Sequence, residues 1–213
     1  MSTQASPIAE KMVFRGTHQK VGRNLFVTPA NSTNRHLSYA RIILNQSNPS
    51  VSFDNGDRET GLICLSGSAT VNVAGSNFDC SQYDSIYIPR DSRIDVKTTS
   101  QVDFAEFSCE VEGHYPLQFV DYAELSKDPS LKFSTGKPGQ SRHLNICLGK
   151  NVQAGRLLAG FTISEPGNWT SWPPRARQDA RGNVRVHRHA RSRLRSAACL
   201  YQYRLSRARG PGS

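Results

Sequence analysis

Short runs of apolar or alternating residues recur along the first 110 positions of the chain, separated by residues that favour turns. The runs cover 37–44, 61–66, 69–73, 84–88, 94–97 and 102–109. Each has the length of a strand rather than of a helix. Turn residues such as those at 54–57, 66–68, 74–77 and 89–92 lie between them. The pattern predicts an all-β unit, an antiparallel barrel or sandwich.

Beyond this unit the pattern changes twice. One short helix is predicted at 121–126, and a segment rich in Gly, Pro and Ser follows it. Strand patterns then resume at 145–148 and 157–163. We therefore expect a first domain over 1–133, a connector over 134–143 and the start of a second domain over 144–174.

The net positive charge of the chain comes from its last segment. The net charge is +10, and residues 175–213 hold 11 Arg and one acidic residue, Asp179. Residues 1–174 are therefore neutral, and a basic surface for nucleic acid is not expected on them. Like-charge repulsion and few apolar residues predict that 175–213 is disordered.

Cysteines and apolar runs bear on the cellular compartment. The five cysteines are widely spaced and form no Cys-x-x-Cys pair, which favours buried free thiols over disulfides or zinc. The N-terminal segment is polar, and no apolar run reaches the length of a membrane span. We expect a cytoplasmic protein with no membrane partner.

The most distinctive motif spans 160–174 and reads GFTISEPGNWTSWPP. Together with 142–149 it resembles the 5-deoxy-glucuronate isomerase family of inositol catabolism, which is related to the keto-deoxy-uronate isomerase of pectin breakdown. The resemblance covers nearly all of 1–174, including 59–73 and 84–89. It implies an all-β bicupin, two double-stranded β-helix (jelly-roll) barrels, of which the first is complete here.

The sequence leaves the family pattern abruptly after Pro174. In the family this Pro-Pro pair is followed at once by His-x-His, whereas this chain continues with Arg175-Ala176-Arg177. Codons for the tail, when read one base later, permit a Glu-His pair after Pro174 and then Leu-Glu-Glu, Tyr-x-Tyr and Phe-Gly-x-Gln, which resemble a strand of this family. We therefore predict that 175–213 is an out-of-frame translation and that the second barrel is truncated at 174.

The resemblance implies an aldose–ketose isomerase that acts on 5-deoxy-glucuronate with a divalent metal, zinc or manganese. Two histidines two residues apart, a glutamate and a later histidine hold that metal in the family. This chain retains none of the four, so we expect no metal and loss of activity. His187 and His189 imitate the pair but lie among arginines, which oppose a cation.

Three residues are candidates for the rim of the substrate pocket: Arg142, Ser171 and Trp172. Basic or polar groups there would hold the carboxylate of a uronate. The general base is not identified. The expected partner is this small-molecule substrate, and a homo-oligomer is compatible with the sequence.

Two other functions stay open. The Arg-rich tail could bind nucleic acid or anionic lipid in a salt-dependent manner, although it has no recognisable fold and only Tyr201 and Tyr203 for base stacking. The chain could also be a non-catalytic cupin that binds a sugar or a partner through its first barrel, which has no His-x-His of its own.

Overall fold

A computed structural model describes residues 14–32, 34–164 and 168, and the backbone of 185–189 and 196–201. Within these residues the regular structure is mostly β-strand, with almost no helix. Its two helices are η1 (Thr17–Gln19) and α2 (Tyr122–Leu125). The strands are β1 (Gly22–Val27), β2 (Ser38–Asn45), β3 (Ser50–Asp54), β4 (Arg58–Gly67), β5 (Ala69–Val73), β6 (Ser76–Cys80), β7 (Ser85–Ile88), β8 (Arg93–Lys97), β9 (Gln101–Glu110), β10 (Gln118–Val120), β11 (Lys132–Thr135), β12 (Arg142–Leu148), β13 (Ala159–Ser164), β14 (Arg185–His189) and β15 (Ser196–Tyr201).

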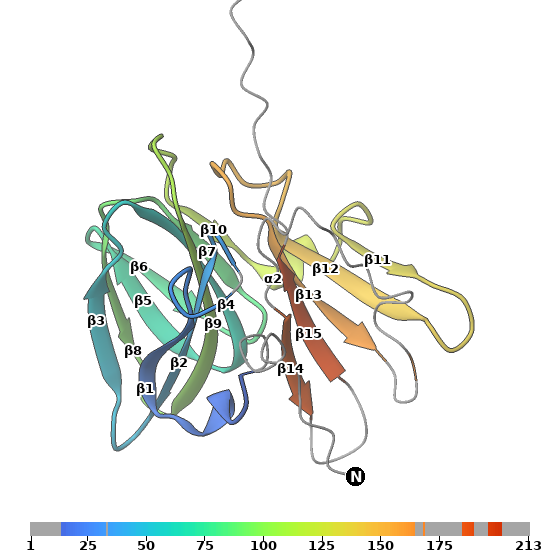
Figure 1. Cartoon of the computed structure of the whole chain (residues 1–213), viewed down its shortest axis with the longest axis horizontal. Helices are drawn as coiled ribbons and strands as arrows, with labels where there is room; N and C mark the ends of the chain where they lie inside the picture. The colour runs from blue at the N-terminus through green and yellow to red at the C-terminus, as the bar shows by residue number, and fades with distance from the viewer. Residues whose placement is uncertain (1–13, 33, 165–167, 169–184, 190–195, 202–213) are drawn as a thin grey trace, which may run out of the picture.

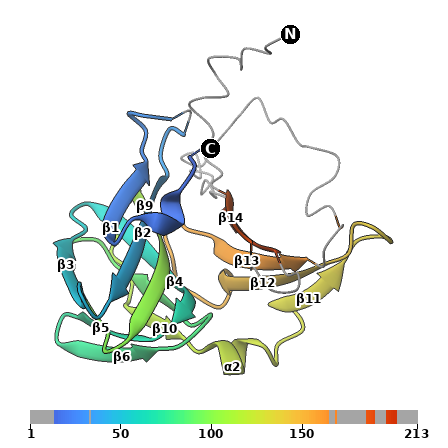
Figure 2. The ribbon, with the colours of Figure 1, turned by 90° about the horizontal axis from the view of Figure 1, so that it is seen from below.

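The strands form three sheets. A six-stranded sheet in the order β1-β2-β9-β4-β7-β10 and a four-stranded sheet in the order β3-β8-β5-β6 make up the first barrel. A further sheet, in the order β11-β12-β13-β15-β14, lies beside that barrel in both views (Figures 1 and 2). We call it the second sheet. The pairings between named strands are antiparallel.

The first barrel is filled by alternate residues of its strands. Leu62 and Cys64 of β4 and Phe104 of β9 are fully buried and belong to one apolar cluster. Strands of the facing sheet supply Val71, Val73, Ile94 and Val96 to the same cluster. Period-two alternation therefore produces a closed interior, as the sequence pattern indicates.

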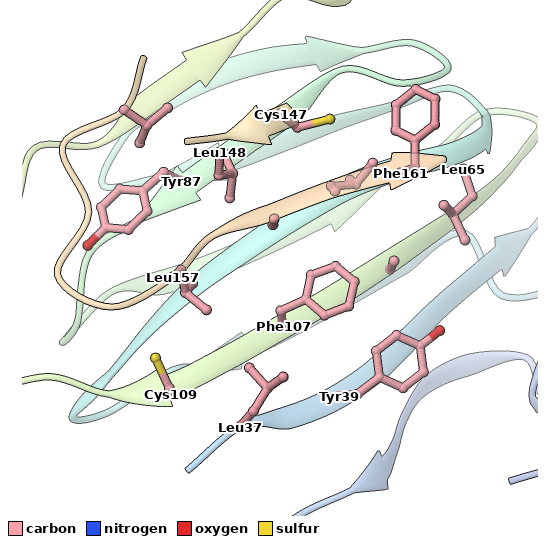
Figure 3. Packing of buried hydrophobic residues seen from close by; sticks show 14 of the residues in the cluster. Leu37, Tyr39, Leu65, Tyr87, Phe107, Cys109, Cys147, Leu148, Leu157 and Phe161 are labelled. Atoms are coloured by element: carbon pink, nitrogen blue, oxygen red, sulfur yellow. The ribbon is translucent and has the colours of Figure 1, made fainter. Parts of the chain in front are cut away.

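A second apolar cluster joins the outer face of the six-stranded sheet to the second sheet. Figure 3 shows Leu148, Leu157 and Phe161 of the later segment close to Tyr87 and Phe107 of the first barrel. Strand β7 and the middle of β4 are consequently buried on both faces. This explains why β7 reads as a nearly continuous apolar run rather than an alternation.

Gly61 of β4 makes this close approach of the two sheets feasible. A Cβ at Gly61 would lie 2.6 Å from Cδ1 of Leu148 and 3.6 Å from Cδ1 of Leu157. Because such a contact is too short for carbon atoms, a larger residue at this position would force the Leu148 side chain to move.

Most expected elements are confirmed. Strands β2, β4, β5, β7, β8 and β9 cover the six runs of the first unit, and α2 lies within 121–126. Asp121 caps that helix by accepting hydrogen bonds from the backbone N–H groups of Ala123 and Glu124. The all-β prediction is confirmed, whereas β1, β3, β6 and β10 were not predicted.

The predicted connector over 134–143 includes strand residues at both of its ends. Ser134 pairs with His143 and Thr135 with Arg142, so both ends of that segment are strands of one hairpin and only 136–141 form its turn. The first strand of the second sheet, β11, therefore begins within the predicted first domain. The Gly, Pro and Ser residues mark the turn of this hairpin.

Part of the tail forms strands. Strands β14 and β15 lie within 175–213, and β15 pairs with β13 from Ala159↔Tyr201 to Ser164↔Ser196. Disorder of this segment in solution stays a prediction. The remainder of 175–213 lies outside the described residues. In the part of the chain that the structure describes, no helix is long and apolar enough to cross a membrane.

Candidate functional site

Three polar side chains lie on one face of the central strands of the second sheet. Arg142 is directly opposite Ser164 in the β12–β13 ladder, and Leu144 is opposite Thr162. Residues that are paired across a ladder project from the same face. Arg142, Thr162 and Ser164 therefore share the face opposite to Phe161, which packs against the first barrel. We call this set the β12–β13 polar face.

The polar face has unused hydrogen-bonding capacity. Ser164 is 1% exposed, and its Oγ has no hydrogen-bond partner among the described residues. Arg142 is only half-buried and donates one long hydrogen bond, 3.4 Å to the carbonyl oxygen of Gln140. None of the ion pairs found in the described residues includes Arg142. A buried hydroxyl beside a guanidinium without a carboxylate suits an anionic, oxygen-rich ligand.

The sequence candidates meet different outcomes. Arg142 is a residue of this polar face, whereas Ser171 and Trp172 lie outside the described residues. Thr162 and Ser164 were missed by sequence reasoning. They alternate with Phe161 and Ile163, so they lie on the other face of β13 from these two residues. Their proximity to Arg142 can be recognised only when the partner strand and its register are known.

A metal centre does not fit the described residues. Among them, no group of three or more His, Cys, Asp or Glu side chains could hold a metal ion. The strand β14 includes His187 and His189, whose side chains lie outside the description. The chemistry of this part of the chain is therefore derived without a metal.

The first barrel holds the second sheet through a buried carboxylate. Glu59 of β4 is 0% exposed. Its Oε2 accepts hydrogen bonds from Tyr87 Oη (2.7 Å) and the Gly155 backbone N–H (2.8 Å). Its Oε1 accepts from the backbone N–H groups of Arg156 (2.6 Å) and Leu157 (2.8 Å). Cys109 Sγ adds a fifth hydrogen bond to Oε1, at 3.3 Å.

Both side-chain donors to Glu59 keep their protons. Burial raises the pKa of Tyr87, and its hydrogen bond to Glu59 raises it further. Burial likewise raises the pKa of Cys109, and the nearby Glu59 charge adds to the rise. The phenol and the thiol are thus fixed as donors to the carboxylate.

Two further contacts fix the same region. Gln118 of β10 accepts a hydrogen bond from the Gln153 N–H (2.9 Å) and donates one to the Gln153 carbonyl oxygen (2.9 Å). The Tyr83 ring stacks on Phe161 of β13 with centroids 4.3 Å apart. Tyr83 has a φ of 77°, a conformation that is costly for a bulky side chain. The stack and the backbone hydrogen bond from Tyr83 N–H to the Cys64 carbonyl oxygen (2.7 Å) stabilise this conformation.

Comparison with known proteins places the chain in a family. The sequence model of the KduI/IolB family matches residues 13–213. The chain belongs to the KduI/IolB family. Members of that family are isomerases of uronate and inositol catabolism. Among curated protein sequences, none matches the chain.

Two solved structures share the fold of this KduI/IolB member. An IolB-like protein from Salmonella typhimurium superposes with a TM-score of 0.64 and 18% identity, over 86% of this chain and 82% of that one. A putative glyoxylate induced protein from Pseudomonas aeruginosa superposes with a TM-score of 0.58 and 12% identity, over 87% and 83%. The all-β, cupin-like architecture is therefore confirmed. Truncation of the second barrel stays a prediction.

Proposed function

We propose that this chain has the fold of an isomerase that converts 5-deoxy-glucuronate to its 2-keto isomer. Membership of the KduI/IolB family carries this proposal, and the fold shared with the IolB-like protein supports it. The reaction moves one proton from the carbon that bears the hydroxyl to the neighbouring carbonyl carbon, and a second proton from that hydroxyl to the carbonyl oxygen. It passes through an enediol, and a general base takes the proton and returns it.

The β12–β13 polar face is our proposed binding site for the substrate carboxylate. A guanidinium binds a carboxylate through two parallel hydrogen bonds, which a neutral side chain cannot supply. The unpartnered Ser164 hydroxyl lies directly opposite Arg142 and can donate a third hydrogen bond. Ser171 and Trp172 stay candidates for the rim of the same pocket.

We further propose that this particular chain binds the acid without converting it. Segment 175–213 has none of the His, His, Glu and His residues that the resemblance implies at those positions. The described residues provide no group that could replace them. On this proposal, the substrate is a small uronate and the compartment is the cytoplasm.

Binding of d-glucuronate, measured by titration calorimetry, tests the proposed carboxylate site. Arg142→Ala should weaken binding at least about tenfold, because a hydrogen-bonded charge pair contributes about 1.5–3 kcal/mol. Arg93→Ala is the matched control, because Arg93 lies on the exposed surface of the first barrel in an ion pair with Asp54 (2.9 Å). Equal affinity of the Arg142→Ala variant and the original chain would contradict the proposal.

The same titration separates the acid-binding function from a scaffold without sugar-acid recognition. d-Glucose has no carboxylate, so the original chain should bind it far more weakly than d-glucuronate. Equal binding of the two sugars would favour a cupin scaffold that does not recognise the carboxylate. Binding of neither sugar would exclude the polar face as a sugar site.

A further inference from the structure

Glu59 of the first barrel accepts hydrogen bonds from residues that are distant in sequence. Its partners Gly155, Arg156 and Leu157 lie 96 to 98 residues away in sequence. Three consecutive backbone N–H groups that converge on one anion form a nest, which binds negative charge by its own dipoles. Here the anion in the nest is the side chain of Glu59, which belongs to the first barrel.

The loop that donates to Glu59 has little free space at Gly155. A Cβ at Gly155 would lie 2.4 Å from Cγ2 of Val111, 2.7 Å from Cε2 of Tyr115 and 3.2 Å from Oε2 of Glu59. A side chain at Gly155 would therefore crowd Val111 and Tyr115 and would press against the Glu59 carboxylate. Both partners of the contact are thus constrained.

This contact leads directly to the proposed binding site. Leu157, the last donor to Glu59, lies two residues before the first residue of β13, Ala159, and both are buried in the cluster between the sheets. The strand then continues to Thr162 and Ser164. A shift of the loop would therefore move the ladder in which Ser164 is opposite Arg142.

We propose that Glu59 is a positioning residue, through which the first barrel fixes loop 149–158 and thereby β13 and its polar face. The first barrel then acts as the support of the second sheet. The link to ligand binding rests on the proposed function; the positioning of the loop does not.

Amide hydrogen exchange of the whole chain tests the positioning directly. Glu59→Gln keeps the size of the side chain but places an NH₂ group against N–H donors. Exchange at 155–157 and in β13 should become at least about tenfold faster, while exchange at Leu62 and Phe104 inside the barrel changes less than about threefold. Equal acceleration in both regions, or none at 155–157, would overturn the proposal.

Glu106→Gln is the matched control. Glu106 is also a buried carboxylate of the six-stranded sheet, but it pairs with Arg23 of the same sheet at 2.7 Å. This variant should leave the ratio of exchange at 155–157 to exchange in the barrel unchanged. A pattern identical to that of Glu59→Gln would show that any lost carboxylate loosens the second sheet.

Milder and reciprocal variants keep the test decisive if Glu59→Gln fails to fold. Tyr87→Phe removes one donor and should accelerate exchange at 155–157 by a smaller factor in the same pattern. Gly155→Ala breaks the contact from the loop side, and combining it with Glu59→Gln should add little to either single change. Full additivity of the two changes would contradict a shared contact.

Affinity for d-glucuronate provides a readout that simple destabilisation does not move. At a temperature where all variants are folded, Glu59→Gln should weaken binding several-fold and Glu106→Gln should not. If the original chain does not bind d-glucuronate, the proposed function fails, while the exchange pattern still decides the role of Glu59. If binding is unchanged in Glu59→Gln, β13 is positioned without Glu59 and the proposal is wrong.

Discussion

At the scale of single residues, buried charged groups on the outer face of the six-stranded sheet are paired or hydrogen-bonded. Arg41 forms a bidentate ion pair with Asp103 at 2.7 and 2.6 Å, and Glu59 accepts five hydrogen bonds. Ser164 is the contrasting case, because its buried hydroxyl has no partner among the described residues. A buried hydroxyl without a partner needs an explanation, and the carboxylate ligand that we propose provides one for Ser164.

The described cysteine thiols are buried, and this burial should limit their reactivity. The described ones, Cys64, Cys80, Cys109 and Cys147, are buried free thiols, as the sequence predicted. Burial raises the pKa of both Cys64 and Cys147 from 9.0 to about 12. Both should therefore resist iodoacetamide at pH 8 in the native protein and react fully in guanidinium, as read by peptide mass spectrometry. Native labelling as fast as unfolded labelling would contradict their burial.

The same raised pKa values make stability depend on pH. Between pH 9 and 12 the folded thiols keep protons that the unfolded thiols lose, so each contributes stability that is present below pH 9 and lost as pH rises. The free energy of unfolding from urea titrations should therefore be lower at pH 10 than at pH 8, by about 1 kcal/mol per buried thiol, with a lower urea midpoint. A midpoint that is equal or higher at pH 10 would be the opposite result.

At the scale of elements, the sequence predicted the strands that are buried on at least one full face and missed those at the edges. β1 is at the edge of the six-stranded sheet, and β3 and β6 are the edges of the four-stranded sheet. In β6 only Cys80 is buried. Edge strands expose most side chains, so they show no apolar run. Arg142 was predicted as a site residue, but Ser164, which lies opposite it, was not. The sequence of one strand does not show which residue of the partner strand is paired with it.

The hairpin between β5 and β6 gives the prediction at this scale. Val73 pairs with Ser76, which leaves Ala74 and Gly75 as a two-residue turn with φ values of 51° and 83°. Two positive φ values define a type I′ turn, which favours Asn-Gly. Ala74→Asn should therefore raise the free energy of unfolding by about 0.5–1 kcal/mol in urea titrations, and Ala74→Val should lower it. A less stable Ala74→Asn variant would show that the turn is not a source of strain.

At the scale of the whole molecule, the first barrel and the second sheet share one apolar cluster and the contacts of Glu59. The sequence predicted two units joined over 134–143, where the structure has a hairpin, and Gly and Pro favour turns within a domain as strongly as between domains. The division into domains stays a prediction. The family match includes 175–213. That this segment is read out of frame stays a prediction, which the coding sequence across Pro173 to Arg177 would settle.

We propose that this KduI/IolB chain lost its isomerase activity with the family segment that follows Pro174. The most direct measurement compares the purified chain with a version whose frame is restored after Pro174, in turnover of 5-deoxy-glucuronate and in metal content by elemental analysis. We predict no detectable turnover and no stoichiometric divalent metal for the chain as it stands, and both properties for the restored version. Equal isomerase activity of the two proteins would contradict the account, because it would place the active site within residues 1–174.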